Sequence, residues 1–367
     1  MRPVSPLALA LAATLALGSR LPAQSTWTLD PKPILDIAGA VPGGAVNFAL
    51  PAGATRLSDG SLLIADRGGL SIQLFDPAGK LLKTAGRNGE GPGEFQTMAW
   101  AGACGRDSML VWDPRLHRAS VVGKSGAVAR QFTIAADVPR ALWFSCGTGG
   151  AIAYLSEPTG RQASTIPNVM LMQANVVTVG RDGALVKNHG QISGGEWFAP
   201  GRGAFPRPLG MTTSIAMVSE SLVIGIGDSA SVLVIAPDGK RTTLAIPAQR
   251  RPPTQEEFDA AVQTIGSMAP GALRQTAIDA LSKAPLPQLL PPYAAVIADA
   301  SGLFWVQLSP SGAKQVDFLA MRLDGRVVAR VRLPRGLSIY EIGRDYVLGS
   351  YSDSGDEVHV AVYRLKR

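Results

Sequence analysis

Short apolar segments alternate with turn residues along almost the whole chain. Runs of Val, Ile, Leu and aromatic residues are bounded by Gly, Asp, Asn and Pro, and this pattern indicates short strands joined by tight turns. In the first unit the pattern predicts strands at 54–57, 62–66, 72–76 and 81–86. Further units begin near residues 98, 141, 214, 294 and 339, so we expect six units of antiparallel strands.

A recurring turn gives the period of these units. It ends in a glycine at five places, and the intervals between them are 47, 57, 56 and 86 residues. The last interval contains an insertion at 254–292, and without it this interval also becomes 47 residues. Four-stranded units repeated about every 50 residues predict a single all-β domain, a β-propeller whose blades surround a central channel.

The last unit has only three evident strands, at 339–343, 346–351 and 358–365. The apolar segment 27–37 has no other unit to join. We expect it to supply the fourth strand of the last blade and so to close the ring, because an open ring would leave an unpaired edge that favours aggregation.

The segment 254–292 is predicted to be a small helical insertion between blades four and five. Thr254 and Glu257 have the spacing of a capping box, and apolar residues recur at helical spacing from Phe258 onwards. A second, shorter helix is expected within 271–283. Its apolar stripe suits a packing face, with the alternative of a cap that restricts entry to the channel.

The first unit resembles an NHL repeat. The resemblance rests on Ile64-Ala65-Asp66, on the segment 72–79 and on the glycine-rich segment 86–95. The whole array, including the ending 343–349, is similar to exported bacterial six-bladed propellers of the same class. This resemblance implies a six-bladed propeller fold. It implies little about a ligand, because Leu155 and Gly227 stand where the first two units carry Asp66 and Asp113.

The N-terminus has the pattern of a secretory signal. Arg2 precedes the apolar run 7–18, and Leu21-Pro22-Ala23 offers a small residue for cleavage. A membrane anchor is the alternative, but the run is shorter than the roughly 20 residues that span a bilayer. We therefore expect a signal peptide at 1–23, a propeller at 24–367 with no transmembrane segment after cleavage, and a periplasmic or extracellular location.

Charge argues against nucleic-acid binding. The formal net charge is +7, and it falls to +5 without Arg2 and Arg20, the two charged residues of the predicted signal. The remaining Lys and Arg residues are scattered, whereas nucleic-acid binding usually needs a clustered basic stripe. A scattered basic surface instead suits anionic partners.

Two cysteines, Cys104 and Cys146, occupy equivalent places in adjacent units. Export would favour a disulfide between them. Equivalent points on neighbouring blades can, however, exceed the Cα separation of about 7 Å that a disulfide permits, so the pairing stays open. A zinc site is not supported, because two lone cysteines without a nearby histidine are a poor ligand set.

No catalytic constellation is evident. His117, His189 and His359 lie in no recognised catalytic frame. Asp66 and Asp113 end their strands, where an aspartate commonly closes a turn with its side chain, and this is favoured over catalysis. For a divalent cation such as calcium in the channel, the nearest ligands would be Glu341 and Asp299.

Long segments concentrate on one face of the predicted propeller. Two kinds of connection lie on this face: the one from the second to the third strand of a blade, and the one from a blade to the next. The long segments 157–167, 190–208 and 254–292 are connections of these kinds. Binding residues tend to lie on loops held by a rigid scaffold. The candidate ligand-binding residues on this face are Arg67, Arg87, Asp113, Arg115, Arg140, Trp197 and Tyr293.

Arginine with aromatic residues suits carboxylate, phosphate or sugar ligands. The sequence thus favours an exported, non-catalytic binding propeller with no cofactor, which takes a small anionic molecule, a peptide or a protein partner. The alternative is a propeller enzyme of the lactonase or lyase type that uses a divalent cation. The sequence does not indicate an oligomeric state.

Overall fold

The computed structural model describes residues 25–41, 45–134, 138–201, 203–269, 271–309 and 314–367. The predicted signal peptide at 1–23 lies outside this part of the chain. Within the described ranges, no helix has both the length and the apolar character needed to cross a membrane.

Three sheets are four-stranded and antiparallel throughout, with strands paired in chain order. The first contains β5 (Pro51–Arg56), β6 (Leu62–Asp66), β7 (Ser71–Phe75) and β8 (Leu81–Ala85). The second contains β9 (Trp100–Ala103), β10 (Ser108–Asp113), β11 (Arg118–Gly123) and β12 (Val128–Thr133). The third contains β19 (Thr213–Val218), β20 (Ser221–Ile226), β21 (Ser231–Ile235) and β22 (Arg241–Ala245).

A six-stranded sheet lies between the second and third of these in the chain. It contains β13 (Ala141–Cys146), β14 (Ile152–Ser156), β15 (Gly160–Ala163), β16 (Val169–Val179), β17 (Leu185–Phe198) and β18 (Phe205–Pro206). β16 and β17 form a long hairpin that takes in the first half of the segment 190–208, and β15, which lies within 157–167, pairs with β16. The sequence had placed both segments in loops. The pairing continues through Gly194 and Gly195 because register shifts absorb them.

Nine of the remaining strands form one sheet. One group is β23 (Tyr293–Ala298), β24 (Phe304–Leu308), β25 (Gln315–Met321) and β26 (Val327–Pro334), and the other is β27 (Ser338–Ile342), β28 (Tyr346–Ser352) and β29 (Val358–Lys366). The N-terminal segment joins them. β1 (Ser25–Leu29) pairs in parallel with β26 and, at its end, with β29, whereas β2 (Leu35–Ala38) adds a fourth, antiparallel strand to β29.

The predicted closing segment 27–37 is therefore divided between two tasks. β2 completes the last group of strands as expected, and β1 seals that group to its neighbour. A short hairpin of β3 (Ala40–Val41) and β4 (Ala45–Val46) follows. Because β1 makes the two groups one continuous sheet, the count of six blades stays a prediction.

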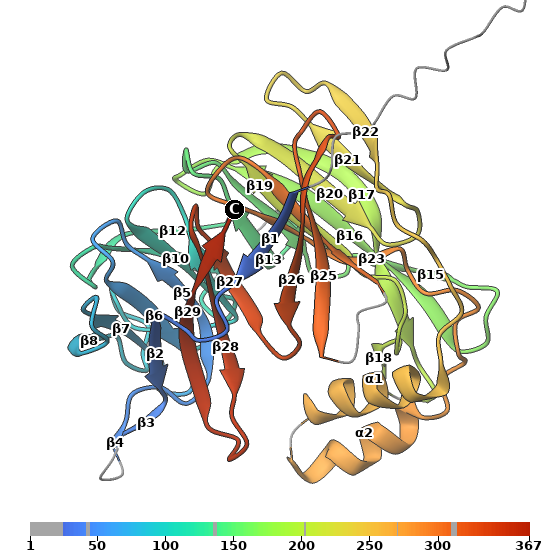
Figure 1. The fold of residues 1–367 in the computed structure, drawn as a ribbon, viewed down its shortest axis with the longest axis horizontal. Coiled ribbons are helices and arrows are strands. Elements are labelled where there is room, and N and C mark those ends of the chain that lie inside the picture. Colours follow the sequence, from blue (N-terminus) through green and yellow to red (C-terminus); the bar gives the residue numbers. More distant parts are fainter. Residues whose placement is uncertain (1–24, 42–44, 135–137, 202, 270, 310–313) are drawn as a thin grey trace, which may run out of the picture.

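The sheets are arranged as a β-propeller. The first strand of each sheet or group lies innermost, and these strands contact one another around the channel, β5 with β9 and β27, and β19 with β13 and β23 (Figure 1). Apolar clusters fill the spaces between neighbouring sheets; one, for example, packs Trp112 of β10 against Phe144 and Tyr154 of the next sheet. β5 and β9 are so close that a Cβ on Gly53 would lie 2.0 Å from the carbonyl oxygen of Ala101.

The predicted insertion is helical and lies between β22 and β23. It contains α1 (Gln255–Ser267), a 3₁₀ turn (Gly271–Leu273) and α2 (Arg274–Leu281), and the predicted capping box of Thr254 and Glu257 is present. Phe258, Val262 and Leu281 form an apolar cluster with Phe198 of β17. The apolar stripe of the insertion thus packs against the long hairpin.

An ion pair at the start of α1 predicts that the insertion loosens in acid. Hydrogen bonding from Arg251, and then from the backbone of Thr254, lowers the pKa of Glu257 to about 2. Since the pKa in the folded state is depressed, this stabilisation is present above the ordinary value of 4.5 and is lost as the pH falls towards 2. We expect faster hydrogen exchange of α1 amides at pH 3 than at pH 5, after correction for intrinsic exchange rates.

The variant Glu257→Gln should show little of this additional exchange at low pH, because glutamine does not titrate. Glu256→Gln is the matched control, since Glu256 is the exposed neighbour in the same turn. If hydrogen exchange of α1 depends on pH equally in wild type and Glu257→Gln, then Glu257 is not the group responsible.

Candidate functional site

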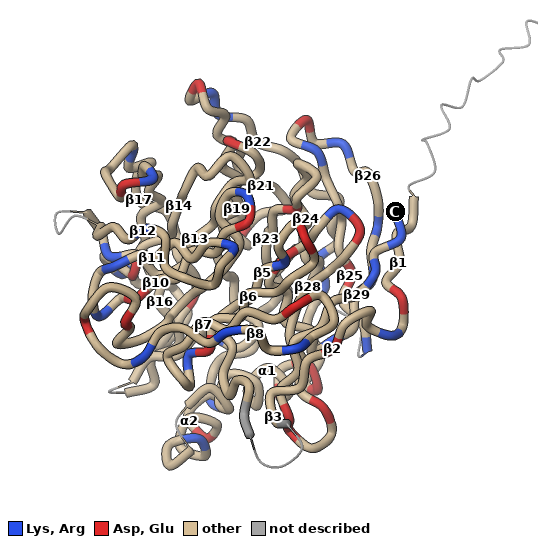
Figure 2. Tube along the Cα trace, turned by 90° about the vertical axis from the view of Figure 1, so that its left-hand side faces the viewer, with Lys and Arg blue, Asp and Glu red and all other residues tan. Residues whose placement is uncertain are grey.

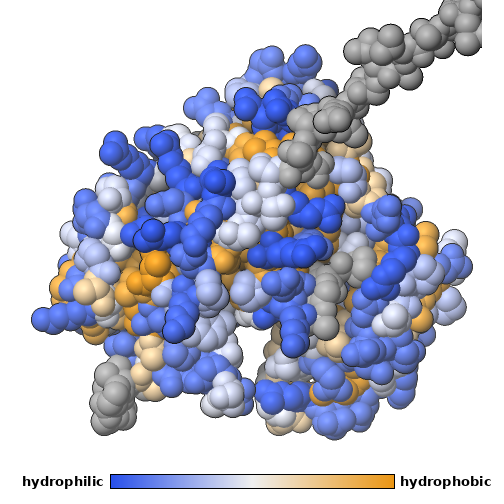
Figure 3. Space-filling view, viewed as in Figure 1, coloured by the Kyte–Doolittle hydropathy of each residue, from blue (hydrophilic) through white to orange (hydrophobic). Residues whose placement is uncertain are grey.

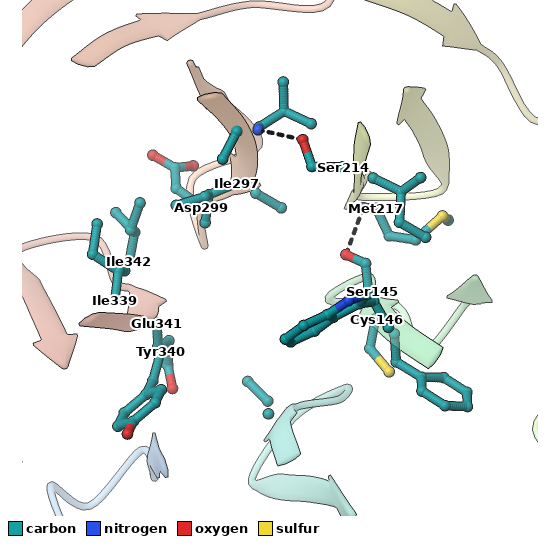
Figure 4. Close-up of a pocket in the computed structure, with 18 of the residues that line it drawn as sticks. Ser145, Cys146, Ser214, Met217, Ile297, Asp299, Ile339, Tyr340, Glu341 and Ile342 are labelled. Atoms are coloured by element: carbon teal, nitrogen blue, oxygen red, sulfur yellow. Dashed lines mark hydrogen bonds between the residues drawn. The ribbon is translucent and has the colours of Figure 1, made fainter. Parts of the chain in front are cut away.

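The central channel contains a cavity of about 510 Å³ (Figure 4). Its walls come from five of the innermost strands, β9, β13, β19, β23 and β27, from the turns that follow three of them, and from Leu155 of β14. Most of the lining is apolar. The larger side chains include Trp100, Trp143, Leu155, Ile215, Met217, Ile297, Ile339 and Ile342.

The cavity wall includes two carboxylates, Asp299 and Glu341. Asp299 accepts hydrogen bonds from the amides of Ser301 (2.8 Å) and Leu303 (2.9 Å) and from Trp305 Nε1 (3.1 Å). It also forms an ion pair with Arg367 at 2.9 Å. Its oxygens therefore hold the turn and the C-terminal residue in place.

Glu341 is satisfied in a similar way. It accepts from Thr55 Oγ1 (2.5 Å), from the amide of Arg56 (3.0 Å) and from the hydroxyl of Tyr346. Burial raises the pKa of Glu341, and these hydrogen bonds oppose the rise. Both carboxylates already accept hydrogen bonds from groups of the protein. They do not suit a calcium site, because calcium needs six to eight oxygen ligands.

One face of the propeller carries the turns between second and third strands and the helical insertion; we call it the loop face. In Figure 1 the loop face is at the bottom, where the β28–β29 turn and the two helices lie, and the β21–β22 turn lies at the opposite end. Figure 3 shows the surface hollowed at this lower edge, between the β28–β29 side and the helical side. The loop face is therefore concave.

Two buried aspartates hold turns of the loop face. Asp66 accepts from the amides of Leu50 (2.9 Å), Gly68 (3.1 Å) and Gly69 (2.8 Å). Asp113 accepts in the same manner from Gln96 (2.7 Å), Thr97 (3.1 Å), Arg115 (3.0 Å) and Leu116 (3.2 Å). Each carboxylate ties its turn to the chain that enters its sheet. Asp113 is 1% exposed, so its position suits this structural task and not ligand binding.

Arg67 lies on the first of these turns and lines a pocket of about 300 Å³ on the loop face. Five residues with hydroxyl groups line the same pocket: Ser338, Tyr340, Ser350, Tyr351 and Ser352. The hydroxyl of Tyr340 bonds to that of Ser350, and the hydroxyl of Tyr351 donates to Asp36. The phenol of Tyr340 is buried, which raises its pKa, and Ser350 and the nearby charge of Arg67 oppose the rise. Among the described residues, the Arg67 guanidinium has no ion pair.

Arg115 lies on the second turn, is exposed, and likewise has no ion pair within the described ranges. Arg140 precedes β13, and its Nη2 lies 2.6 Å from Nε2 of His117. The turn that carries Arg115 therefore contacts Arg140 through His117, and these two candidate arginines belong to one region of the loop face.

The other candidates lie elsewhere. Arg87 is paired with Glu94 at 2.6 Å, and Trp197 is a half-buried residue of β17. Tyr293 is 1% exposed, and its hydroxyl donates to the carbonyls of Ile226 (2.9 Å) and Ser231 (2.7 Å). Burial raises the pKa of Tyr293. Tyr293 therefore joins two sheets, and the structure does not bring it to a ligand surface.

The two cysteines form a disulfide in the structure. Their Cα atoms are 4.8 Å apart, within the range that a disulfide permits. Cys104 follows β9 and Cys146 ends β13, so the bond links two neighbouring innermost strands. Cys146 also contributes to the wall of the channel cavity.

A small group of possible metal ligands lies at the β28–β29 turn. Ligand atoms of Asp353, Glu357 and His359 lie within 4.8 Å of one another. Asp353 accepts from the amides of Gly355 and Glu357, and Glu357 accepts from the amide of Ala40. These hydrogen bonds explain the positions of both carboxylates without an ion.

Positions of both charge signs are dispersed along the Cα trace in Figure 2, without a continuous basic stripe in that view. This agrees with the scattered arginines and lysines of the sequence.

Comparisons with known proteins give no family. No protein-family model matches the chain, and no curated protein matches it. Solved structures resemble it at low identity. A candidate exported protein from Bacteroides fragilis is 10% identical with a TM-score of 0.49, and the match covers 95% of this chain and 98% of that one.

Two further structures have similar values. A member of the DUF4221 family from Bacteroides vulgatus is 11% identical with a TM-score of 0.47, over 94% of this chain and 99% of that one. Virginiamycin B lyase from Staphylococcus aureus is 13% identical with a TM-score of 0.43, over 93% and 99%. We base no functional conclusion on likenesses of this size.

Proposed function

We propose that the chain is an exported, six-bladed propeller of NHL-like repeats that binds a ligand on its loop face without converting it. The ligand carries a carboxylate or a similar anionic group, as a small molecule, a peptide or an acidic segment of a protein partner. The six blades follow if the nine-stranded sheet is counted as two, joined by β1.

The pocket at Arg67 carries this proposal. An exposed guanidinium without an ion pair in the described structure stands beside Ser338 and Ser352 in a concave site. Guanidinium and hydroxyl donors together match the acceptor oxygens of a carboxylate. The turn beneath Arg67 is fixed by Asp66, so the ligand would not have to order it. Arg115 and Arg140 extend the positive charge along the same face.

The proposal is tested with a fluorescein-labelled tetraglutamate peptide and the chain without residues 1–23, by fluorescence anisotropy. We expect saturable binding that weakens with salt. Arg67→Ala should weaken it about tenfold, as a hydrogen bond to a charged group is worth about 1.5–3 kcal/mol. Smaller losses are expected for Arg115→Ala and Arg140→Ala, which lie farther along the face.

Arg326→Ala is the matched control. It removes the same charge from an exposed turn between β25 and β26, at the opposite end of the sheets. Equal weakening by Arg67→Ala and Arg326→Ala would show that only net charge matters, and the Arg67 site would be wrong. A thermal shift with calcium or zinc that a chelator reverses would instead favour the lactonase or lyase alternative.

A further inference from the structure

The channel cavity differs in chemistry from the Arg67 pocket, and its most unusual feature is an exposed tryptophan. Trp143 lies on β13, lines the cavity and is 55% exposed. The register of β13 with β14 shifts between Ala141 and Trp143. This irregularity leaves two successive large apolar residues, Leu142 and Trp143, exposed on one innermost strand.

An exposed indole in an apolar cavity indicates a place for a ligand. Tryptophan has a large apolar surface that gains from burial and stacking, and ligand sites are typically concave, mostly apolar cavities of about 300–1,000 Å³. At about 510 Å³ the channel cavity lies within that range. Trp100, the first residue of β9, and Met217 of β19 add further apolar walls.

Two hydroxyl groups provide polar contacts in this wall (Figure 4). Ser145 Oγ accepts from the amide of Met217 at 2.8 Å, and Ser214 Oγ accepts from the amide of Val296 at 2.8 Å. Neither hydroxyl donates to an acceptor among the described residues. Because backbone donors fix both oxygens, each hydroxyl proton is available to an acceptor atom in the cavity.

The charge of the lining selects against anions. Asp299 and Glu341 are its charged residues within the described structure, and no Lys, Arg or His lines the cavity there. An anion would meet two carboxylates, and the cation beside them, Arg367, is already paired with Asp299, so an anion is unfavourable there. Both carboxylates already accept hydrogen bonds from the protein's own donors, so they would add little binding energy for a cationic ligand.

We propose that the channel binds a neutral small molecule with a flat, aromatic body and one or two hydrogen-bond acceptors. The aromatic body stacks on Trp143, and the acceptors lie at the hydroxyls of Ser145 and Ser214. This site is separate from the anion site at Arg67 and does not depend on it.

Two matched probes test the charge preference. N-phenyl-1-naphthylamine is neutral and aromatic, and 8-anilino-1-naphthalenesulfonate has the same ring system with an added sulfonate. We expect the neutral probe to bind one equivalent of the chain without residues 1–23, with a rise in its emission, and the sulfonate to bind at least tenfold more weakly. Equal affinities of the two probes would overturn the proposal.

The variant Trp143→Ala should weaken the neutral probe about tenfold, and Trp143→Phe should recover part of the loss because it keeps an aromatic face. Trp197→Ala removes a half-buried tryptophan outside the cavity and is the matched control. A thermal melt of each variant shows whether it is folded. If Trp143→Ala does not fold, Trp143→Phe decides the result, because it too is expected to bind the neutral probe more weakly than wild type. Unchanged affinity in folded Trp143 variants would refute the site.

The two proposals fail independently. Arg67→Ala should leave the neutral probe unaffected, and Trp143→Ala should leave tetraglutamate binding unaffected. If Arg67→Ala weakens both ligands equally, then the two sites are one, and the separate channel site is wrong.

Discussion

Replacing Trp27 with alanine is expected to destabilise the protein by about 3–5 kcal/mol, as for other buried tryptophans. Trp27 is 6% exposed and lies on β1, the strand that joins the two groups of the nine-stranded sheet. The ring centroid of Trp27 lies 6.0 Å from that of Trp305, and the Arg367 guanidinium lies 4.5 Å from the centre of the Trp27 ring. Arg367 in turn pairs with Asp299.

This substitution removes more than one contact. Without the indole, β1 loses its anchor between β26 and β29, and Arg367 loses the ring on which it stacks. We expect a lower urea midpoint and faster proteolysis of the N-terminal segment. Ile34→Ala is the control, because Ile34 belongs to the same segment but is 48% exposed. A change of less than about 1 kcal/mol for Trp27→Ala would mean that β1 is not needed to close the ring.

Removing the disulfide is the second large change. The bond joins residues 42 positions apart, and for a loop of that length the loss of chain entropy in the unfolded state corresponds to about 4 kcal/mol. The double variant Cys104→Ser/Cys146→Ser should therefore unfold at a lower urea concentration than the oxidised protein. The comparison is made by equilibrium urea unfolding.

Reduction provides the control for this prediction. A reducing agent should shift wild type towards the double variant and leave the double variant unchanged. Free thiols in the untreated protein, measured by mass spectrometry after alkylation, would contradict the disulfide.

The repeat was predictable because its turns require particular residues. Gly79 and Gly239 both adopt a positive φ, close to 85°, which residues with a Cβ rarely adopt, so their spacing revealed the period. The helical insertion was predictable for a similar reason, since Thr254 and Glu257 form a local motif. The long β16–β17 hairpin was not, because glycines such as Gly194 and Gly195 usually mark loops and only the pairing partner shows otherwise.

The site was less predictable than the fold. Arg67 and Asp113 both lie at turns of the loop face, but one is exposed in a pocket and the other is buried beneath its turn. Sequence position alone does not separate these cases. Trp143 was missed because an apolar residue in a strand is usually part of the core; its exposure follows from a register shift that has no local signal.

The pairing of β1 and β2 with strands near the C-terminus has a consequence for the order of folding. Ser25 bonds to Val328, 303 residues away, and Asp36 bonds to His359, 323 residues away. Such distant contacts cost much loop entropy before they form and are associated with slow folding. A chain that is synthesised from its N-terminus keeps its first two strands without partners until the last ones exist, so the ring closes only after the chain is nearly complete.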